Sequence, residues 1–341
     1  MDGFFTEEWL NNVEQVLDGK MPDYLVIQHM EPDHSASIPA FLKKYPKVTV
    51  VSTAKGFQFM EQFFPEFFAE QGLPAEQRIV AANDGILELG QHSLHFVYAP
   101  MVHWAEVMMT YEATEKILFA ADGFGKFGAL DVEEEWTDEA RRYYIGIVGK
   151  YGPQVQAVLK KAAGLDIQTI CSLHGPVLKE NLGFYLEKYD KWSSYQPEES
   201  GVVIAYASVY GNTRSAAEYL ADVLQEKGQK TVLYDLARCD KAKAVADAFR
   251  YDRLVLAGIT YNGDLFPCMR SFIEGLTERN YQNRKVAIIE NGTWAPMAGK
   301  LILGMFEKSK NLTFTETTVS IKSAMNEQNK GEIGKLAEEL C

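Results

Sequence analysis

The sequence predicts an α/β protein of two domains, and three observations support that prediction. The length of 341 residues corresponds to about two domains. From about residue 201, short apolar runs alternate with amphipathic stretches, which indicates a doubly wound parallel sheet with helices on both faces. The N-terminal half also carries strand-like and helical segments, in a less regular order. We expect the boundary near Pro197, which gives the domains 1–197 and 198–341.

The C-terminal half carries the clearer pattern. Its first apolar run, VVIAYAS, is followed by residues 212–228, whose apolar side chains recur at helical spacing up to a final glycine. Strands that alternate with helices in this way pair in parallel. The expected strands are 202–208, 231–236, 253–258, 285–291 and 314–321.

The N-terminal half contains apolar runs of strand length and longer helical patterns. The long stretch 138–165 reads as two helices that are split near Gly152-Pro153, because proline and glycine both interrupt a helix. The expected strands are 24–28, 48–53, 94–100, 116–122 and 167–175, and the other expected helices are 9–19, 57–72 and one that begins near 183.

Composition excludes several classes of protein. The net charge of −13 would repel nucleic acid. No apolar run reaches the roughly 18 residues of a membrane span, and the first residues do not form a secretory signal. We therefore expect no nucleic-acid or membrane partner and a cytoplasmic location. The four cysteines are not spaced as CxxC, so no thiolate metal site is encoded.

The first strand of the C-terminal half runs directly into a polar loop, SVYGNT, and then a helix. Backbone N–H groups at a helix N-terminus attract a phosphate, and Ser208 and Thr213 add hydroxyl donors. Gly211 allows the tight turn that such a loop needs. Taken alone, the loop could equally be a simple helix cap formed by Asn212 or Thr213.

Two further loops follow the third and fourth strands of this half. They read GITYNGDLFP and ENGTWAP, and each places an aromatic residue, Tyr261 or Trp294, among small polar residues. Ligands of open α/β sheets bind at the carboxyl ends of the strands. An aromatic side chain there can flank a flat ring, although it can also simply close the core.

The motifs SVYGNT, TYNG and NGTW, in this strand order, resemble a flavodoxin-like domain over residues 201–341. The resemblance implies the strand order 2-1-3-4-5 and bound FMN, with its phosphate in the first loop and its ring between the other two. The residues implied to contact FMN are Ser208, Val209, Tyr210, Gly211, Asn212, Thr213, Thr260, Tyr261, Asn262, Gly263, Asn291, Gly292, Thr293 and Trp294.

The N-terminal half has a dense group of possible metal ligands in IQHMEPDHS, residues 27–35. In an extended chain, His29, Glu31 and Asp33 would point the same way, and His34 would turn elsewhere after the stiff Pro32. One loop could therefore serve two metals.

Three more candidate ligands follow later strands: His103, Asp122 and His174. Each of them alone could be an ordinary turn residue. Together with the first group they indicate a metal site. His92 and His95 lie in or near a strand, and we read them as ordinary sheet residues.

The ligand pattern resembles the metallo-β-lactamase fold, with Glu31 in place of a histidine in the usual HxHxDH motif. The pattern HxExDH, then His, Asp and His, beside a flavodoxin-like domain, resembles the flavodiiron proteins. The resemblance implies an αβ/βα domain. Because the first ligand motif lies so close to Met1, we expect this domain to lack some of the usual N-terminal strands. The resemblance also implies one iron held by His29, Glu31 and His103, a second held by Asp33, His34 and His174, and Asp122 as the bridge; family members differ at the position of His34. No catalytic residue beyond these ligands is expected.

A carboxylate in place of an imidazole makes the site harder and more anionic, which suits iron better than zinc. Glu31, Asp33 and Asp122 supply three negative charges against the four positive charges of two ferrous ions. One bridging hydroxide would then neutralise the site.

The resemblance implies reduction of O2 to water, of NO to N2O, or of both. It also implies a head-to-tail homodimer, or a tetramer built from it, and a separate rubredoxin or reductase as electron donor. Two other functions stay open: an FMN electron carrier with a non-catalytic first domain, and a zinc hydrolase with a flavin module.

Overall fold

The computed structural model describes residues 1–341 and divides into two compact units. The first unit comprises Met1–Glu135 and Pro153–Leu186, and the second comprises Trp136–Gly152 and Glu187–Cys341. Helix α6 (Trp136–Ile147) thus belongs by its contacts to the unit of the C-terminal sheet, although it precedes Pro197. The domain ranges 1–197 and 198–341 stay a prediction. No helix in the structure combines the length and the apolar character that crossing a membrane requires.

The first unit begins with a small parallel sheet in the order β1-β2-β3. Helices that precede and follow β2 in the chain pack around this sheet. Their apolar side chains form one core cluster with Met30 and Val50, which are fully buried. The elements are α1 (Thr6–Leu17), β1 (Tyr24–Val26), α2 (Pro32–Ser35), α3 (Ile38–Lys44), β2 (Thr49–Ser52), α4 (Ala54–Phe63), α5 (Pro65–Glu70) and β3 (Arg78–Val80).

A second sheet of the first unit has the order β4-β5-β6-β7-β8. Its strands are antiparallel except for the pair β7 and β8, which is parallel, so these two strands end at the same edge. The elements are β4 (Ile86–Glu88), β5 (Ser93–Tyr98), β6 (Met108–Glu112), β7 (Ile117–Phe119), α7 (Gly152–Ala162), β8 (Thr169–Cys171) and the beginning of α8 (Leu182–Ser193).

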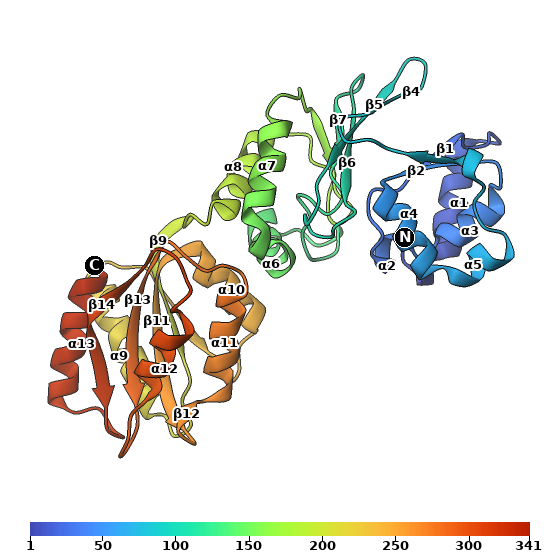
Figure 1. The fold of residues 1–341 in the computed structure, drawn as a ribbon. Coiled ribbons are helices and arrows are strands. Elements are labelled where there is room, and N and C mark those ends of the chain that lie inside the picture. The colour runs from blue at the N-terminus through green and yellow to red at the C-terminus, as the bar shows by residue number, and fades with distance from the viewer. The chain divides into compact units, whose positions relative to one another are not determined.

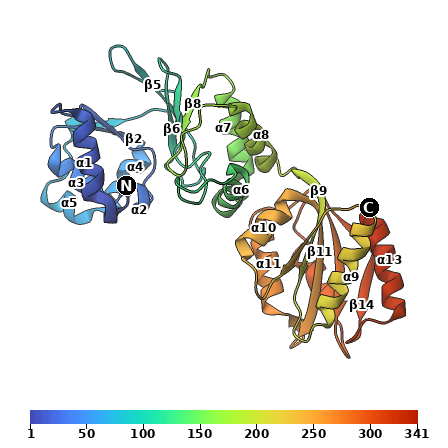
Figure 2. The same cartoon turned by 180° about the vertical axis from the view of Figure 1, so that it is seen from behind.

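The sheet of the second unit has the order β10-β9-β11-β13-β14, all parallel, which confirms the predicted order 2-1-3-4-5. Helices α9 and α13 cover one face and α10, α11 and α12 cover the other (Figures 1 and 2). The elements are β9 (Glu199–Tyr206), α9 (Asn212–Glu226), β10 (Thr231–Asp235), α10 (Lys241–Arg250), β11 (Tyr251–Tyr261), β12 (Asp264–Leu265), α11 (Pro267–Thr277), β13 (Arg284–Asn291), α12 (Ala298–Met305), β14 (Leu312–Ile321) and α13 (Glu327–Leu340).

The register of this sheet brings its functional loops together. Tyr206 at the end of β9 lies opposite Ala257 of β11, and Ile259 of β11 lies opposite Asn291 at the end of β13. Because the strands are parallel, the loops after β9, β11 and β13 all leave the same edge.

Several elements differ from the sequence prediction. The strands β3, β4 and β6 were not predicted, and the expected helix 57–72 is interrupted between α4 and α5. The interruption falls at Phe64, immediately before Pro65, where proline removes an N–H and disfavours a helical residue before it. The predicted split near Gly152-Pro153 is confirmed, because α6 ends at Ile147 and α7 begins at Gly152.

Candidate metal centre and flavin pocket

The first unit brings all seven predicted ligands together as two neighbouring groups. His29, Glu31, His103 and Asp122 form one group, and Asp33, His34 and His174 form the other. Within each group the possible ligand atoms lie within 4.8 Å of one another.

The first group is buried at His29 and partly exposed at Glu31. The Nε2 atom of His103 lies 3.0 Å from Oε2 of Glu31, and Nε2 of His29 lies 3.3 Å from the same oxygen. The His29 side chain is fully buried, whereas the side chain of Glu31 is 35% exposed. Glu31 therefore occupies the solvent side of this group.

The second group is more open. The Nε2 atom of His174 lies 3.2 Å from Oδ2 of Asp33, and Nε2 of His34 lies 3.5 Å from the same oxygen. The side chains of Asp33 and His174 are 40% and 34% exposed. This group has the more direct access from solvent.

The sequence-based expectation that His29, Glu31 and Asp33 point the same way is wrong. Pro32 does not prolong an extended chain but begins the short helix α2, in which His34 N–H donates to the carbonyl of Glu31. This turn moves Asp33 away from Glu31 and into the group of His34 and His174. Proline is favoured at the first helical position, where its missing N–H has no partner to lose.

Asp122 joins the two groups. Its Oδ2 atom lies 3.2 Å from Nε2 of both His29 and His103, while its Oδ1 lies 3.0 Å from Nε2 of His34 and 3.5 Å from that of His174. Burial alone would raise the pKa of this carboxyl, but the surrounding histidines hold it far below its usual range. Asp122 is therefore ionised and has one oxygen toward each group.

Hydrogen bonds between strand ends bring these residues together. The backbone N–H of Met108, at the start of β6, donates to the carbonyl of Gln28 over 3.1 Å, and the side-chain amide of Gln28 donates to the carbonyl of Phe119 over 2.7 Å. The loop after β1 is thereby tied to β6 and β7. Because β7 and β8 are parallel, Asp122 and His174 leave adjacent strands at the same edge.

One residue of this centre was missed by the sequence interpretation. Glu106 Oε1 lies 2.7 Å from Nδ1 of His29 and accepts a hydrogen bond from the backbone N–H of Met30 over 3.0 Å. Burial would raise the pKa of Glu106, but these hydrogen bonds outweigh it and lower that pKa. Burial would lower the pKa of His29, but Glu106 and Asp122 outweigh it and raise that pKa. The only sequence signal was an acidic residue just after His103, in HWAEV.

The donors of the two groups fit a pair of metal ions. Asp33 Oδ1, His103 Nε2 and Asp122 Oδ2 are buried and make no hydrogen bond. Buried polar atoms without a hydrogen bond are rare unless an ion or a water completes them. Nitrogen and carboxylate donors in these proportions suit iron.

The other two histidines lie outside both groups. Nδ1 of His92 lies 3.0 Å from Oε1 of Glu112, and the ring of His95 packs against that of Tyr111. His95 lies in β5 and His92 immediately before it, so both lie in or near a strand and have local contacts, as expected.

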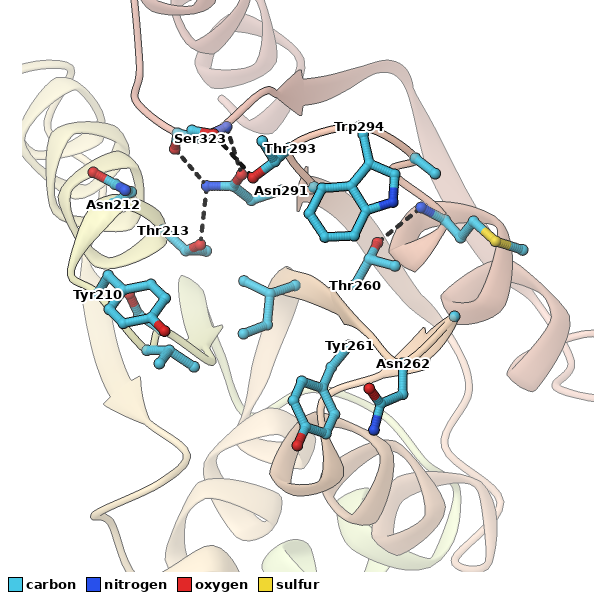
Figure 3. Close-up of a pocket in the computed structure, with 17 residues that line it drawn as sticks. Tyr210, Asn212, Thr213, Thr260, Tyr261, Asn262, Asn291, Thr293, Trp294 and Ser323 are labelled. Carbon is cyan, nitrogen blue, oxygen red and sulfur yellow. Dashed lines mark hydrogen bonds between the residues drawn. The ribbon is translucent and has the colours of Figure 1, made fainter.

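The second unit carries a cavity of about 540 Å³ at the edge where β9, β11 and β13 end (Figure 3). The predicted FMN residues line it, except Gly211, whose φ of +90° forms the turn before α9. The lining residues are Ser208, Val209, Tyr210, Asn212, Thr213, Ile259, Thr260, Tyr261, Asn262, Gly263, Asn291, Gly292, Thr293, Trp294, Ala295, Met297 and Ser323.

Hydrogen bonds hold the loops around this cavity. The hydroxyl of Thr260 accepts from the backbone N–H of Met297 over 2.8 Å, which ties the end of β11 to the start of α12. The side-chain amide of Asn291 donates to the hydroxyl of Thr213 over 3.3 Å and to the carbonyl of Ser323 over 2.8 Å (Figure 3). Asn291, at the end of β13, thus connects the first turn of α9 to the segment after β14.

Aromatic side chains at the rim are unusually exposed. Tyr210 is 91% exposed, Trp294 is 89% exposed and Tyr261 is 49% exposed. Large aromatic residues in a rim of polar loops are suited to covering the faces of a flat ligand. The volume, the phosphate-type loop before α9 and these rings fit FMN.

The sequence interpretation missed four lining residues: Ile259, Ala295, Met297 and Ser323. Ile259, Ala295 and Met297 adjoin the predicted loops, so only the loop boundaries differed. Ser323 follows β14 and could have been found only from the sheet order, which places β14 beside β13.

A family model described as an ODP family beta lactamase matches residues 3–175, half of the chain. The chain belongs to this family. A model of the flavodoxin domain matches residues 203–312, and beta-lactamase-like and flavodoxin domains in this order are the arrangement of flavodiiron proteins.

Curated relatives and a solved structure agree with this assignment. Diflavin flavoprotein A 1 of Synechocystis is 32% identical over 244 residues, which cover 69% of this chain and 41% of that protein. A nitric oxide reductase of Moorella thermoacetica is 26% identical over 307 residues, covering 87% of this chain and 75% of the relative. The structure of rubredoxin oxygen:oxidoreductase from Desulfovibrio gigas shares the fold, with a TM-score of 0.90 at 22% identity, covering 100% of this chain and 85% of the other. The chain spans about two fifths of the length of the two diflavin flavoproteins that it matches.

Proposed function

We propose that this protein is a flavodiiron oxidoreductase that reduces O2 to water, NO to N2O, or both. The observation that carries the proposal is Asp122, which has one carboxylate oxygen toward each of two ligand groups. A shared carboxylate suits a site where two metals act on one small substrate. The flavin pocket of the same chain gives such a site a source of electrons.

FMN and two iron ions are the cofactors that fit this combination of domains. His29, Glu31 and His103 would hold one iron, Asp33, His34 and His174 the other, and Asp122 both. The close approach of His34 Nε2 to Asp122 Oδ1, at 3.0 Å, supports the inclusion of His34. When bound, the iron pair would supply the electron-transfer chemistry. The chain's ligand residues would hold it, with Glu31, Asp33 and His174 on the side toward solvent.

The electron count defines the reaction. O2 takes four electrons and four protons to give two waters, and two NO take two electrons and two protons to give N2O and water. Reduced FMN delivers at most two electrons at a time, so a separate rubredoxin or reductase would reload it. A head-to-tail homodimer, alone or within a tetramer, would let the flavin of one protomer serve the irons of its partner.

Two other functions are weaker. A zinc hydrolase would favour an imidazole at the position of Glu31, which lies 3.0 Å from His103. An FMN electron carrier with an inert first domain would not need seven convergent ligands.

Metal and flavin analysis, followed by turnover with NO under anaerobic conditions and separately with O2, tests the proposal. The purified protein should contain FMN and about two irons per chain, and reduced protein should convert NO to N2O, O2 to water, or both. Two bound zinc ions with hydrolytic activity, or bound flavin without metal, would refute it. The ratio of the NO and O2 rates then defines the preferred substrate.

A further inference from the structure

Glu106 and His29 form a buried pair at the inner side of the metal centre. The exposed fractions of their side chains are 1% and 0%, and Oε1 of Glu106 lies 2.7 Å from Nδ1 of His29. The same oxygen accepts the backbone N–H of Met30. Glu106 therefore contacts both the imidazole and the backbone of the loop that presents it.

The contact of His29 with Glu106 leaves a single ring nitrogen for the ligand group. With Nδ1 on Glu106, Nε2 points to Oε2 of Glu31 at 3.3 Å and Oδ2 of Asp122 at 3.2 Å. The ring of Trp104 packs perpendicular to that of His29, with centroids 5.2 Å apart at 89°. His29 is thus oriented from two sides, and its free nitrogen faces the group.

A carboxylate behind a ligating imidazole has two physical effects. It fixes the tautomer and the orientation of the ring, and it makes the other nitrogen a stronger donor. Both effects act through His29 and therefore on the group that contains Glu31 and His103.

We propose that Glu106 is a positioning residue for His29, and that its charge strengthens His29 as a ligand of the iron held with Glu31 and His103. This inference rests on the proposed diiron function. It assigns the two irons unequal environments, with the oxidised state favoured at the His29 iron. Glu106 itself contacts neither substrate nor metal in this proposal.

The hydrogen bonds of Glu106 allow its charge and its positioning to be tested separately. Both donors, His29 Nδ1 and Met30 N, meet Oε1, whereas Oε2 is buried and makes no hydrogen bond. In Glu106→Gln the amide oxygen can keep both contacts while the charge is lost. In Glu106→Ala the charge and both contacts are lost together.

The chain offers a matched control. Glu112 is also a buried carboxylate with an oxygen 3.0 Å from the Nδ1 of a histidine, His92, which belongs to neither metal group. Glu112→Gln removes the same charge beside the same ring atom, away from the candidate ligands.

The experiment measures ferrous ion affinity by competition with a chelator, and the reduction potentials of the irons, in the FMN-loaded full chain. Glu106→Ala should weaken one of the two irons about 10- to 100-fold, the range known for such outer partners. Glu106→Gln should keep two irons but raise the reduction potential of one, and Glu112→Gln should match the wild type. FMN content should be equal in all variants.

The outcomes separate the proposals. Wild-type protein that binds no iron contradicts the proposed function itself. Wild-type protein with two irons, together with Glu106→Gln and Glu106→Ala proteins of unchanged affinity and potential, overturns only the role of Glu106. If Glu106→Ala does not fold, an unchanged potential in Glu106→Gln still overturns the role of its charge.

Discussion

The candidate metal centre and the flavin pocket differ in burial and in the kind of side chain that lines them. The metal centre gathers buried charged groups: Asp122 is 2% exposed, and its ionised carboxylate is surrounded by imidazoles at about 3 Å. The flavin pocket is lined by small polar loops and by aromatic rings that stand in solvent, with Trp294 at 89% exposure. The carboxylates of the metal centre are suited to binding positive ions, whereas the exposed rings of the flavin pocket are suited to packing against a flat ligand.

A second buried carboxylate shows what the metal centre lacks. The side chain of Glu198 in the second unit has no exposed surface and is thus as deeply buried as the 2% exposed Asp122, but Arg141 and Lys188 contact it directly. The protein itself supplies the countercharge there. Around Asp122 the fold supplies only histidines. In the proposed diiron site, metal ions would supply the positive charge that side chains supply to Glu198.

Replacing the shared carboxylate should have the largest effect. Asp122→Asn keeps the shape but removes the charge that faces both groups, so iron affinity should fall about a thousandfold or more, about 4 kcal/mol. Iron analysis after dialysis measures this loss. FMN content is the internal control, and equal loss of flavin would point to misfolding instead.

Metal removal should destabilise one unit and spare the other. Ligands that bind only the folded state stabilise it by about 3–4 kcal/mol at several hundred to a thousand times their Kd. Chelation should therefore speed hydrogen exchange around β1, β7 and β8, while the sheet from β9 to β14 keeps its protection. Equal change in both units would contradict a metal site confined to the first.

Acid should weaken the second unit through Glu198. Burial opposes its ionisation, but Arg141, Lys188 and Trp192 lower the pKa of Glu198 from 4.5 to about 2. Since the folded pKa is depressed, this stabilisation is present above about pH 4.5 and is lost as the pH falls toward 2. Over this window the free energy of unfolding of the second unit, measured by denaturant titration, should fall by on the order of 2 kcal/mol more in the wild-type protein than in Glu198→Gln. Parallel pH dependence of the two proteins would contradict the assignment.

Loss of the exposed ring at the flavin pocket should have the smallest effect. Trp294→Ala removes a ring that would cover one face of FMN. The affinity of the protein for FMN should therefore fall about 5- to 10-fold, about 1 kcal/mol. Fluorescence titration of the apoprotein with FMN measures this change. Phe4→Ala, which removes an aromatic residue that is 95% exposed in the first unit, is the matched control and should leave FMN binding unchanged.

The sequence predicted most where the local pattern and the strand order agree. Alternating strands and helices predicted the order 2-1-3-4-5, and ligand-type residues after strands predicted both sites, because parallel strands end at the same edge. The short strands β3, β4 and β6 escaped because they lack a clear alternation.

The remaining differences depend on contacts between distant segments. Asp33 does not point the same way as His29 and Glu31, because Pro32 starts a helical turn instead of extending the chain. Its place beside His34 and His174 is the one that the resemblance implied. Glu106 and Ser323 matter only through their partners, His29 and Asn291, which are 77 and 32 residues away. No local pattern indicates the pair of Glu106 and His29, whereas Ser323 could have been found only from the order of the strands.

The product of oxygen reduction tests the central claim most directly, namely that the metal centre and the flavin pocket work as one enzyme. A reduced flavin alone gives O2 two electrons and releases hydrogen peroxide. The reduced flavin and the two irons together should give O2 four electrons and release water. Fully reduced, iron-loaded protein mixed with O2 should form no peroxide, and Asp122→Asn with FMN bound should form it. Stoichiometric peroxide from the iron-loaded wild-type protein would contradict the account.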